Sequence, residues 1–142
     1  MAEGKSYLEP GFVMKSLIGP LAMRSGKIPV LTVAGRTSGQ PRSLPIGRPV
    51  EVDGRRYLVS PRGETHWVRN LRAAGCGSLR SHGVTESFRA VEVEAEERDH
   101  AIAAYRAAAG KPVAPAFAKL PDAADHPTFR LDDAVVVSGP KG

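Results

Sequence analysis

The segment GRTSGQPR, residues 35–42, gathers groups that bind anions. Arg36 and Arg42 each offer a planar fork of donors, which suits bidentate capture of a phosphate or carboxylate. Thr37 and Ser38 add hydroxyl groups, and the two glycines let the backbone approach a ligand closely. The segment is not a Walker A loop, because no Gly-Lys-Ser/Thr ending and no helix follow. We therefore expect a phosphate-binding turn here; the alternative is a solvated turn whose arginines are surface charges.

The segment THWVRNLRAAGCG, residues 65–77, predicts a short helix next to a second binding region. Thr65 is a good N-cap whose hydroxyl would accept a backbone N–H bond, and Gly75 provides a left-handed stop. The helix start exposes N–H groups and the positive end of the helix dipole, directly after the sequence Pro-Arg-Gly. Trp67 lies two residues into the helix, either as a wall of the site or as a core anchor.

The chain offers no obvious catalyst of its own. Cys76 is the only cysteine, no GxSxG nucleophile elbow is present, and the four histidines have no metal-ligand spacing. Glu96 and Glu97 begin a predicted helix, where compensation of the helix dipole explains them. An anion site without a protein-based catalyst or a metal site is typical of an enzyme whose cofactor supplies the chemistry.

Charge is unevenly distributed along the chain. Residues 1–90 hold 14 Lys/Arg against 6 Asp/Glu, whereas residues 91–142 hold 6 against 9, within a total net charge of +5. The basic part indicates an anionic partner. Nucleic acid is disfavoured, because aromatic residues make up only 6% of the chain and none alternate with basic ones as stacking platforms.

The apolar and turn patterns predict a small antiparallel barrel. Residues 28–34 form a buried strand, residues 42–60 form two strands joined by an Asp53-Gly54 turn, and residues 78–95 form a hairpin. Pro45 and Pro49 lack N–H donors, so their strand is expected at an edge or interrupted. Residues 96–110 form a helix, and residues 127–139 give one or two final strands. About six antiparallel strands with flanking helices make a mainly β, α+β domain.

One domain over residues 1–142 is expected, with residues 1–26 as a helical N-terminal extension. Residues 12–23 are weakly amphipathic, and they either pack on the domain or contact a membrane surface peripherally. Lys15, Gly19 and Pro20 interrupt any signal-peptide core, and no apolar run reaches the length of a membrane span. The expected location is the cytoplasm.

The chain resembles the deazaflavin-dependent nitroreductase family. The resemblance rests on five segments that occur in this order: the apolar strand, GRTSGQPR, the proline-containing strand, DGRRYLVSPRG and HWVRNLRAAG. The resemblance covers residues 28–94 and continues weakly to the end of the chain. It implies a split β-barrel, related in fold to the FMN-binding pyridoxamine-phosphate-oxidase-like enzymes. It also implies coenzyme F420, a deazaflavin with a phosphate and polyglutamate tail, with FMN as the alternative cofactor.

The resemblance also assigns roles to residues. Arg36, Thr37, Ser38 and Arg42 would contact the phosphate and tail of the cofactor. The loop before the tryptophan helix would lie along the deazaflavin ring. Its residues are Pro61, Arg62 and Gly63, with Trp67 at the helix start. Asn70 would tether that helix.

The implied reaction passes a hydride from reduced F420 to a small activated acceptor: a nitroaromatic, a quinone or an enone. Two features depart from many catalytic members: Thr65 stands where proline is usual, and the segment at 110–127 has Phe117 as its only aromatic residue. The alternative is therefore a protein of the same superfamily that binds an apolar, fatty-acid-like ligand without turnover. Tyr105 is a candidate proton donor, with a core role as its alternative. The resemblance implies that the protein is a monomer or a homodimer.

Overall fold

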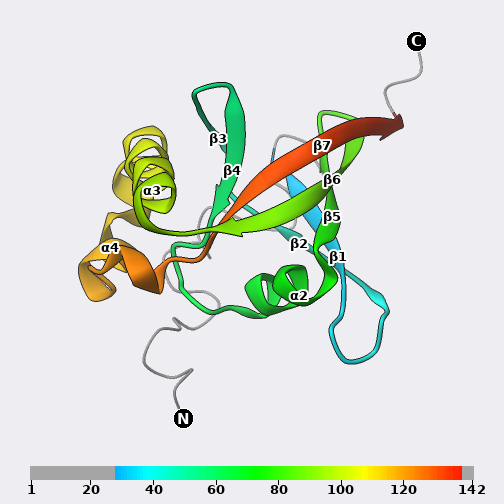
Figure 1. Ribbon diagram of the computed structural model, residues 1–142, viewed down its shortest axis with the longest axis horizontal. Helices are drawn as coiled ribbons and strands as arrows, with labels where there is room; N and C mark the ends of the chain where they lie inside the picture. The colour runs from blue at the N-terminus through cyan, green and yellow to red at the C-terminus, as the bar shows by residue number, and fades with distance from the viewer. Residues whose placement is uncertain (1–27, 139–142) are drawn as a thin grey trace.

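The computed structural model describes residues 28–138 of the chain. Seven strands form one antiparallel sheet in the order β2-β1-β5-β6-β7-β4-β3 (Figure 1). The strands are β1 Val30–Ala34, β2 Pro41–Pro45, β3 Val50–Val52, β4 Arg55–Val59, β5 Cys76–Ser81, β6 Val84–Val93 and β7 Thr128–Ser138. The helices are α2 His66–Ala74, α3 Ala95–Ala109 and α4 Ala114–Lys119, with 3₁₀ turns η3 Lys111–Val113 and η4 Ala123–Asp125.

Local chemistry explains the turns and the sheet edges. Asp53 and Gly54 have φ angles of 52° and 79°, which confirms the predicted type I′ turn between β3 and β4. The prolines interrupt the segment between β1 and β4, which divides into β2 and β3. These two strands lie at opposite edges of the sheet, where a missing N–H donor costs no ladder bond.

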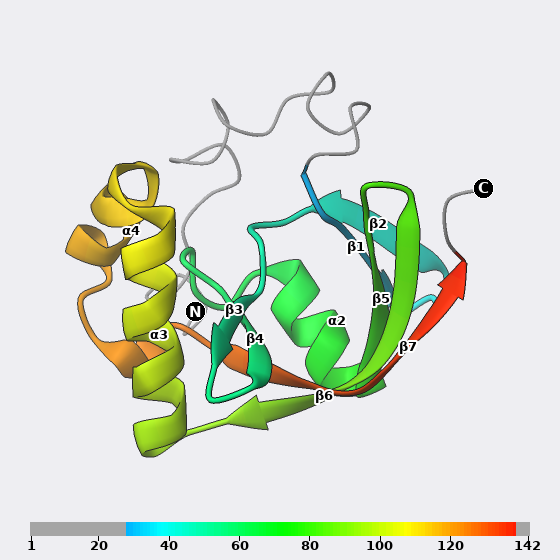
Figure 2. The same ribbon diagram turned by 90° about the horizontal axis from the view of Figure 1, so that it is seen from above.

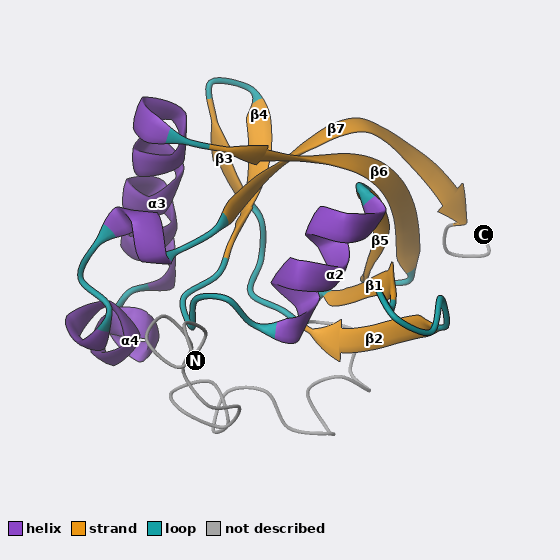
Figure 3. Ribbon diagram, turned by 60° about the horizontal axis from the view of Figure 1, so that its bottom comes forward, coloured by secondary structure: helices purple, strands orange, loops and turns teal. Residues whose placement is uncertain are grey.

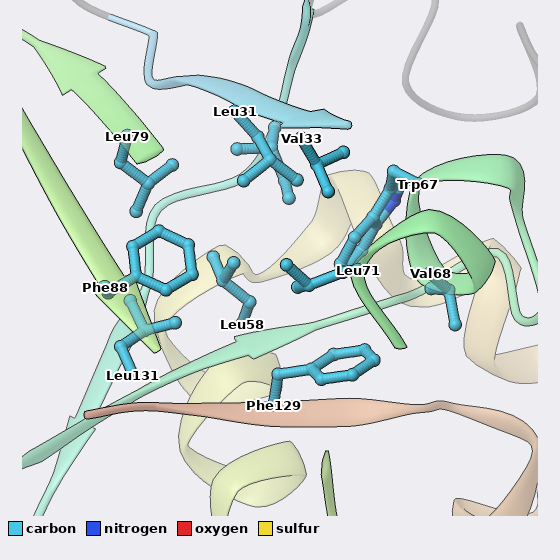
Figure 4. Close-up of a cluster of buried hydrophobic side chains, with 11 residues drawn as sticks. Leu31, Val33, Leu58, Trp67, Val68, Leu71, Leu79, Phe88, Phe129 and Leu131 are labelled. Atoms are coloured by element: carbon cyan, nitrogen blue, oxygen red, sulfur yellow. The ribbon is translucent and has the colours of Figure 1, made fainter. Parts of the chain in front are cut away.

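The sheet curves around α2, which lies inside the curve formed by β1, β5, β6 and β7 (Figure 3). β6 and β7 are the longest strands, and their pairing shifts register near Thr85 and again near Ser87, which increases local bending. Trp67 and Leu71 of α2 point toward Leu58 and Phe129 in the barrel core (Figure 4). The rings of Trp67 and Phe129 are 6.1 Å apart and inclined by 52°.

A second core lies outside the barrel, where α3 packs against β3 and β4 (Figure 2). Ile102, Tyr105 and Phe117 are buried there. His126 stacks on Phe117 at 4.1 Å, and its ring nitrogens lie 2.9 Å from the carbonyl oxygen of Ser60 and 2.6 Å from that of Leu120. This histidine therefore joins the end of β4 to the segment after α4.

The predicted fold class is confirmed, with differences in detail. The sheet has seven strands rather than about six, because the proline-containing segment contributes two. α4 was not anticipated, and the final segment forms a single strand, β7. The predicted helix at 12–23 lies outside the described residues. Within residues 28–138, none of the helices has both the length and the apolar character needed to cross a membrane.

Candidate cofactor-binding site

A groove of about 520 Å³ opens between the β1–β2 turn and the start of α2. Five of the residues predicted to bind the cofactor line it together: Arg36, Thr37, Ser38, Arg42 and Trp67. The remaining lining residues are Val33, Gly35, Ser43, Leu44, His66 and Asn70. The structure thus brings the GRTSGQPR turn and the tryptophan helix, which are far apart in sequence, to one cavity.

The turn holds its shape through its own backbone. The Gly35 N–H donates to the Gln40 carbonyl at 2.8 Å, and the Gly39 N–H donates to the Gly35 carbonyl at 2.8 Å. Gly39 has a φ of 75°, which glycine adopts without steric cost. Ser38 Oγ accepts a hydrogen bond from the Gln40 N–H at 3.1 Å. Its own hydroxyl proton can still donate a hydrogen bond to a ligand. The turn is therefore preorganised around Arg36 and Ser38.

Asn70 connects the turn to α2. Its Oδ1 accepts one hydrogen bond from the Arg36 backbone N–H at 3.1 Å and another from Arg36 Nη1 at 2.7 Å. This confirms the tether expected of Asn70. His66 lies one helical turn before Asn70, and its Nδ1 is 3.4 Å from Arg36 Nη2. His66 was not predicted as a site residue, although its i, i+4 spacing from Asn70 on the predicted helix places the two side chains on the same face.

The arginines of the groove differ from most other arginines in the described structure. Within residues 28–138, no carboxylate forms an ion pair with Arg36 or Arg42. Elsewhere arginines meet carboxylates, in the pairs Arg56–Glu86, Arg72–Glu64, Arg72–Glu92, Arg130–Glu97 and Arg130–Asp132. The groove therefore presents two positive charges that its own neighbours leave uncompensated, which favours an anionic ligand.

The start of α2 corrects one expectation. Thr65 occupies the N-cap position, but its hydroxyl makes no capping hydrogen bond. Its Oγ1 is buried and has no hydrogen-bond partner among the described residues. The helix ends as predicted, with the Gly75 N–H donating to the Leu71 carbonyl at 2.8 Å and a φ of 74° at Gly75. A buried hydroxyl without a partner is unusual in a folded protein, and Thr65 is not among the residues that line the groove.

The loop before α2 does not reach the groove. Pro61, Arg62 and Gly63 are not among the residues that line the groove. The loop is closed by Ser60 Oγ, which donates to the Gly63 carbonyl at 2.6 Å. Its next residue, Glu64, accepts two hydrogen bonds from Arg72 of α2, both at 2.9 Å. The contact of this loop with a cofactor ring stays a prediction.

Trp67 belongs to the barrel core and also lines the groove. Its side chain is only 5% exposed. Packing against Phe129 fixes the orientation of the indole ring. Trp67 therefore forms a rigid apolar wall opposite the polar turn.

Comparison with known proteins identifies the family of the chain. A family profile for F420H2-dependent quinone reductases matches residues 14–114. No curated protein sequence matches significantly. A solved F420-H2 dependent reductase, FDR-A, has 28% sequence identity, a TM-score of 0.60, and coverage of 74% of this chain and 93% of its own.

Two further structures extend the comparison. A chain described as a domain-swapped dimer has 26% identity and a TM-score of 0.55, over 74% of this chain and 79% of its own. A NimC/NimA family protein from Clostridium acetobutylicum, at 14% identity and a TM-score of 0.58, covers 92% of this chain and 87% of its own, and shows the fold alone. With the family profile spanning more than half of the sequence, the chain belongs to the F420H2-dependent quinone reductase family and is an oxidoreductase that uses coenzyme F420.

Proposed function

We propose that the groove holds the phosphate-bearing tail of F420 and that the protein reduces a small activated acceptor. The observation that carries this proposal is the pair Arg36 and Arg42, which face one cavity without a carboxylate partner among residues 28–138. Guanidinium groups bind phosphates and carboxylates bidentately, and the tail of F420 contains both. The donor set therefore fits the cofactor that the family uses.

The start of α2 adjoins the groove. Thr65 is buried there, one residue before His66, which lines the groove. We propose that Pro61, Arg62 and Gly63 lie along the ring system, with Trp67 orienting it from the helix.

Bound reduced F420 supplies a hydride from its ring. Among this chain's own residues, Arg36, Thr37, Ser38 and Arg42 hold the tail, and Asn70 fixes the position of Arg36. Orientation is the main contribution of the protein to such a reaction. The proposed acceptors are quinones, enones and nitroaromatics.

Binding of the cofactor can be measured directly. The purified protein is titrated with F420, following quenching of F420 fluorescence, and with FMN in parallel. We expect F420 to bind below about 10 μM, a free energy of roughly −7 kcal/mol. Absence of F420 binding at that concentration range, with FMN binding instead, would overturn the proposal.

The double variant Arg36→Ala/Arg42→Ala tests the groove. Each charge-assisted hydrogen bond contributes about 1.5–3 kcal/mol, so F420 affinity should fall by about 100-fold or more. The control is Arg80→Ala/Lys111→Ala, which removes the same net charge from exposed positions outside the groove. Equal affinities in the two variants would refute the assignment of the groove, provided that circular dichroism shows both to be folded.

Turnover is tested separately. F420H2 oxidation is followed with menadione and with a nitroaromatic compound as acceptors. Steady oxidation supports a reductase. Binding of F420 without oxidation by any acceptor would instead favour a protein that binds ligands without turnover.

A further inference from the structure

His126 is a titratable side chain that has no part in the function proposed above. It follows η4, lies two residues before β7, and is fully buried. Its Nδ1 lies 2.9 Å from the carbonyl oxygen of Ser60, and its Nε2 lies 2.6 Å from the carbonyl oxygen of Leu120. Both nitrogens of the ring therefore face a backbone acceptor.

Two carbonyl acceptors require two donated protons. A carbonyl oxygen has no proton to give, so each contact is a hydrogen bond only if the nitrogen of His126 carries a proton. A neutral imidazole has one N–H and one bare nitrogen, whose lone pair would face a carbonyl oxygen at 2.6 or 2.9 Å. Water cannot relieve that contact, because the side chain is fully buried. The geometry therefore fits the imidazolium, which donates from both nitrogens.

The surroundings of the ring stabilise a positive charge. Burial disfavours a charge that has no partner, but hydrogen bonds from a charged donor are stronger than neutral ones, and the ring makes two. The ring of His126 also stacks on Phe117, with the centroids 4.1 Å apart and the planes inclined by 27°. The face of an aromatic ring attracts a cation, so Phe117 adds to the stabilisation.

Other charged groups around the ring make no direct contact with it. Within residues 28–138, the nitrogens of His126 bond only to the two carbonyl oxygens, and no carboxylate forms an ion pair with the ring. Tyr105 packs on Phe117 and is neutral, because burial raises its pKa to about 12. The charged residues on the surrounding segments are Arg62 after β4, Arg106 of α3, Lys119 of α4, Asp122 and Asp125 before His126, and Arg130 of β7.

Ser60 connects His126 to the loop before α2. The Ser60 carbonyl accepts from Nδ1 of His126, and the Ser60 N–H donates to the Pro127 carbonyl at 3.0 Å. Ser60 Oγ donates to the Gly63 carbonyl at 2.6 Å, which closes the loop at residues 61–63. His126 thus fixes, through Ser60, one end of the loop for which we propose contact with the ring of F420.

We propose that His126 is an imidazolium in the folded protein and a positioning residue, whose second proton keeps the loop at residues 61–63 in place for the ring of the cofactor. A ring with one proton keeps only one of its two bonds, so it no longer joins Ser60 to Leu120. His126 is not among the residues that line the groove, so it acts through the loop. The positioning role deepens the proposed function and rests on it, whereas the charge state does not.

The charge state is measured by NMR of protein labelled with nitrogen-15 in histidine, without any cofactor. The chain contains four histidines, so the triple variant His66→Gln/His82→Gln/His100→Gln leaves His126 alone and assigns its signals. Chemical shifts distinguish ring nitrogens that carry a proton from bare ones. At about pH 7.5, where exposed histidines are mostly neutral, we expect both nitrogens of His126 to carry protons. One bare nitrogen at that pH would overturn the proposal.

The hold on the loop is measured by hydrogen exchange in the variant His126→Gln, whose side chain has one donor group. The Thr65 N–H, which donates to the Gly63 carbonyl at 2.8 Å, reports on the loop. The Gly75 N–H reports on the other end of α2. We expect Thr65 to exchange about 10-fold faster than in the unmodified chain and Gly75 to exchange at the same rate. Equal acceleration of the two amides, or none, would overturn the role of His126.

A second measurement needs no substitution at His126. The ratio of the two exchange rates, Thr65 to Gly75, is followed in the unmodified chain as the pH is raised. Both amides share the dependence of exchange on hydroxide, so the ratio isolates the loop. We expect the ratio to rise in step with the loss of the second proton from His126. A ratio that stays constant through that loss would contradict the proposal, even if His126→Gln does not fold.

The link to the cofactor is measured by the affinity for F420. We expect the affinity to fall about 3- to 10-fold in His126→Gln and to be unchanged in His100→Gln, which replaces an exposed histidine of α3. Equal affinities in these two variants would overturn the positioning of the loop for the ring. If the unmodified chain does not bind F420, the proposed function and this positioning fail together. The NMR and exchange measurements still decide the charge state of His126 and its hold on the loop.

Discussion

Arginine side chains have different neighbours in the groove and on the other side of α2. In the groove, Arg36 contacts an amide oxygen and a histidine ring, and it meets no carboxylate among the described residues. On the other side of α2, Arg72 donates to both Glu64 and Glu92, with distances from 2.7 to 2.9 Å. The paired arginine holds elements together, whereas the unpaired one is available to an anion. Neighbouring charge, rather than exposure, therefore distinguishes Arg72, which links two elements, from Arg36, for which we propose a role in cofactor binding.

Asn70→Asp should give Arg36 a carboxylate neighbour like those of Arg72, and of the predicted changes it should have the largest effect, which is on F420 affinity. The substitution keeps the size of the side chain but places a carboxylate next to Arg36. At a separation of a few ångströms from the ligand, the added charge should lower F420 affinity by about 10- to 100-fold. Gln40→Glu is the matched control, because it adds the same charge to the same turn outside the cavity lining. An affinity as high in Asn70→Asp as in Gln40→Glu would show that Arg36 does not bind the tail.

Arg72→Met should expose the structural role of the paired arginine. Arg72 joins the loop before α2, through Glu64, to β6, through Glu92. The pairs are partly exposed and therefore screened, so we expect the free energy of unfolding to fall by about 1 kcal/mol. Arg98→Met is the control, because the ion pair of Arg98 in the described part of the chain is with its neighbour Asp99 and so does not link two elements. Urea denaturation measures both variants, and equal stabilities would contradict the linking role.

The anion-binding turn of the groove could be predicted from sequence because its residues are consecutive. GRTSGQPR carries its donors within one turn, and the start of α2 follows from the Thr65 and Gly75 signals at its two ends. The contacts of His126 could not be predicted in this way. Ser60 is 66 residues from His126 in sequence, and only the pairing of β4 with β7 brings them together. A contact between residues that are far apart in sequence has no local sequence pattern from which it could be predicted.

The sequence also could not show that, among residues 28–138, no carboxylate pairs with Arg36 or Arg42. The uneven charge of the chain indicated an anionic partner, but it could not say which arginines were already paired. Glu86 is 30 residues from Arg56 in sequence and meets it only because their strands share the sheet. The predicted capping hydrogen bond of Thr65 was wrong for a related reason. A residue type suited to capping predicts where a helix starts, whereas the rotamer of Thr65 depends on the residues that surround it.

Thr65→Val should test the start of α2 with a smaller effect. Valine has nearly the same shape and removes a buried hydroxyl that has no partner in the described structure. We expect the free energy of unfolding to rise by about 1 kcal/mol. Thr128→Val is the matched control, because Thr128 Oγ1 donates to the His126 carbonyl at 3.0 Å and its loss should destabilise the protein. Destabilisation by both substitutions would show that Thr65 is satisfied in solution.

The smallest expected effect is on the pH dependence of stability. It concerns Glu86, a carboxylate that is paired with an arginine. The hydrogen bond from Arg56, at 2.9 Å from Nη1 to Oε2, lowers the pKa of Glu86 below its ordinary value near 4.5. A lowered pKa in the folded protein contributes stability above the unfolded value, and that contribution is lost as the pH falls through the folded value. Glu86→Gln should therefore make the melting temperature fall less steeply between about pH 6 and pH 3 than in the unmodified protein. Glu94→Gln removes an exposed carboxylate without an ion pair in the described part, and an equal change in slope there would mean that the Arg56–Glu86 pair contributes nothing.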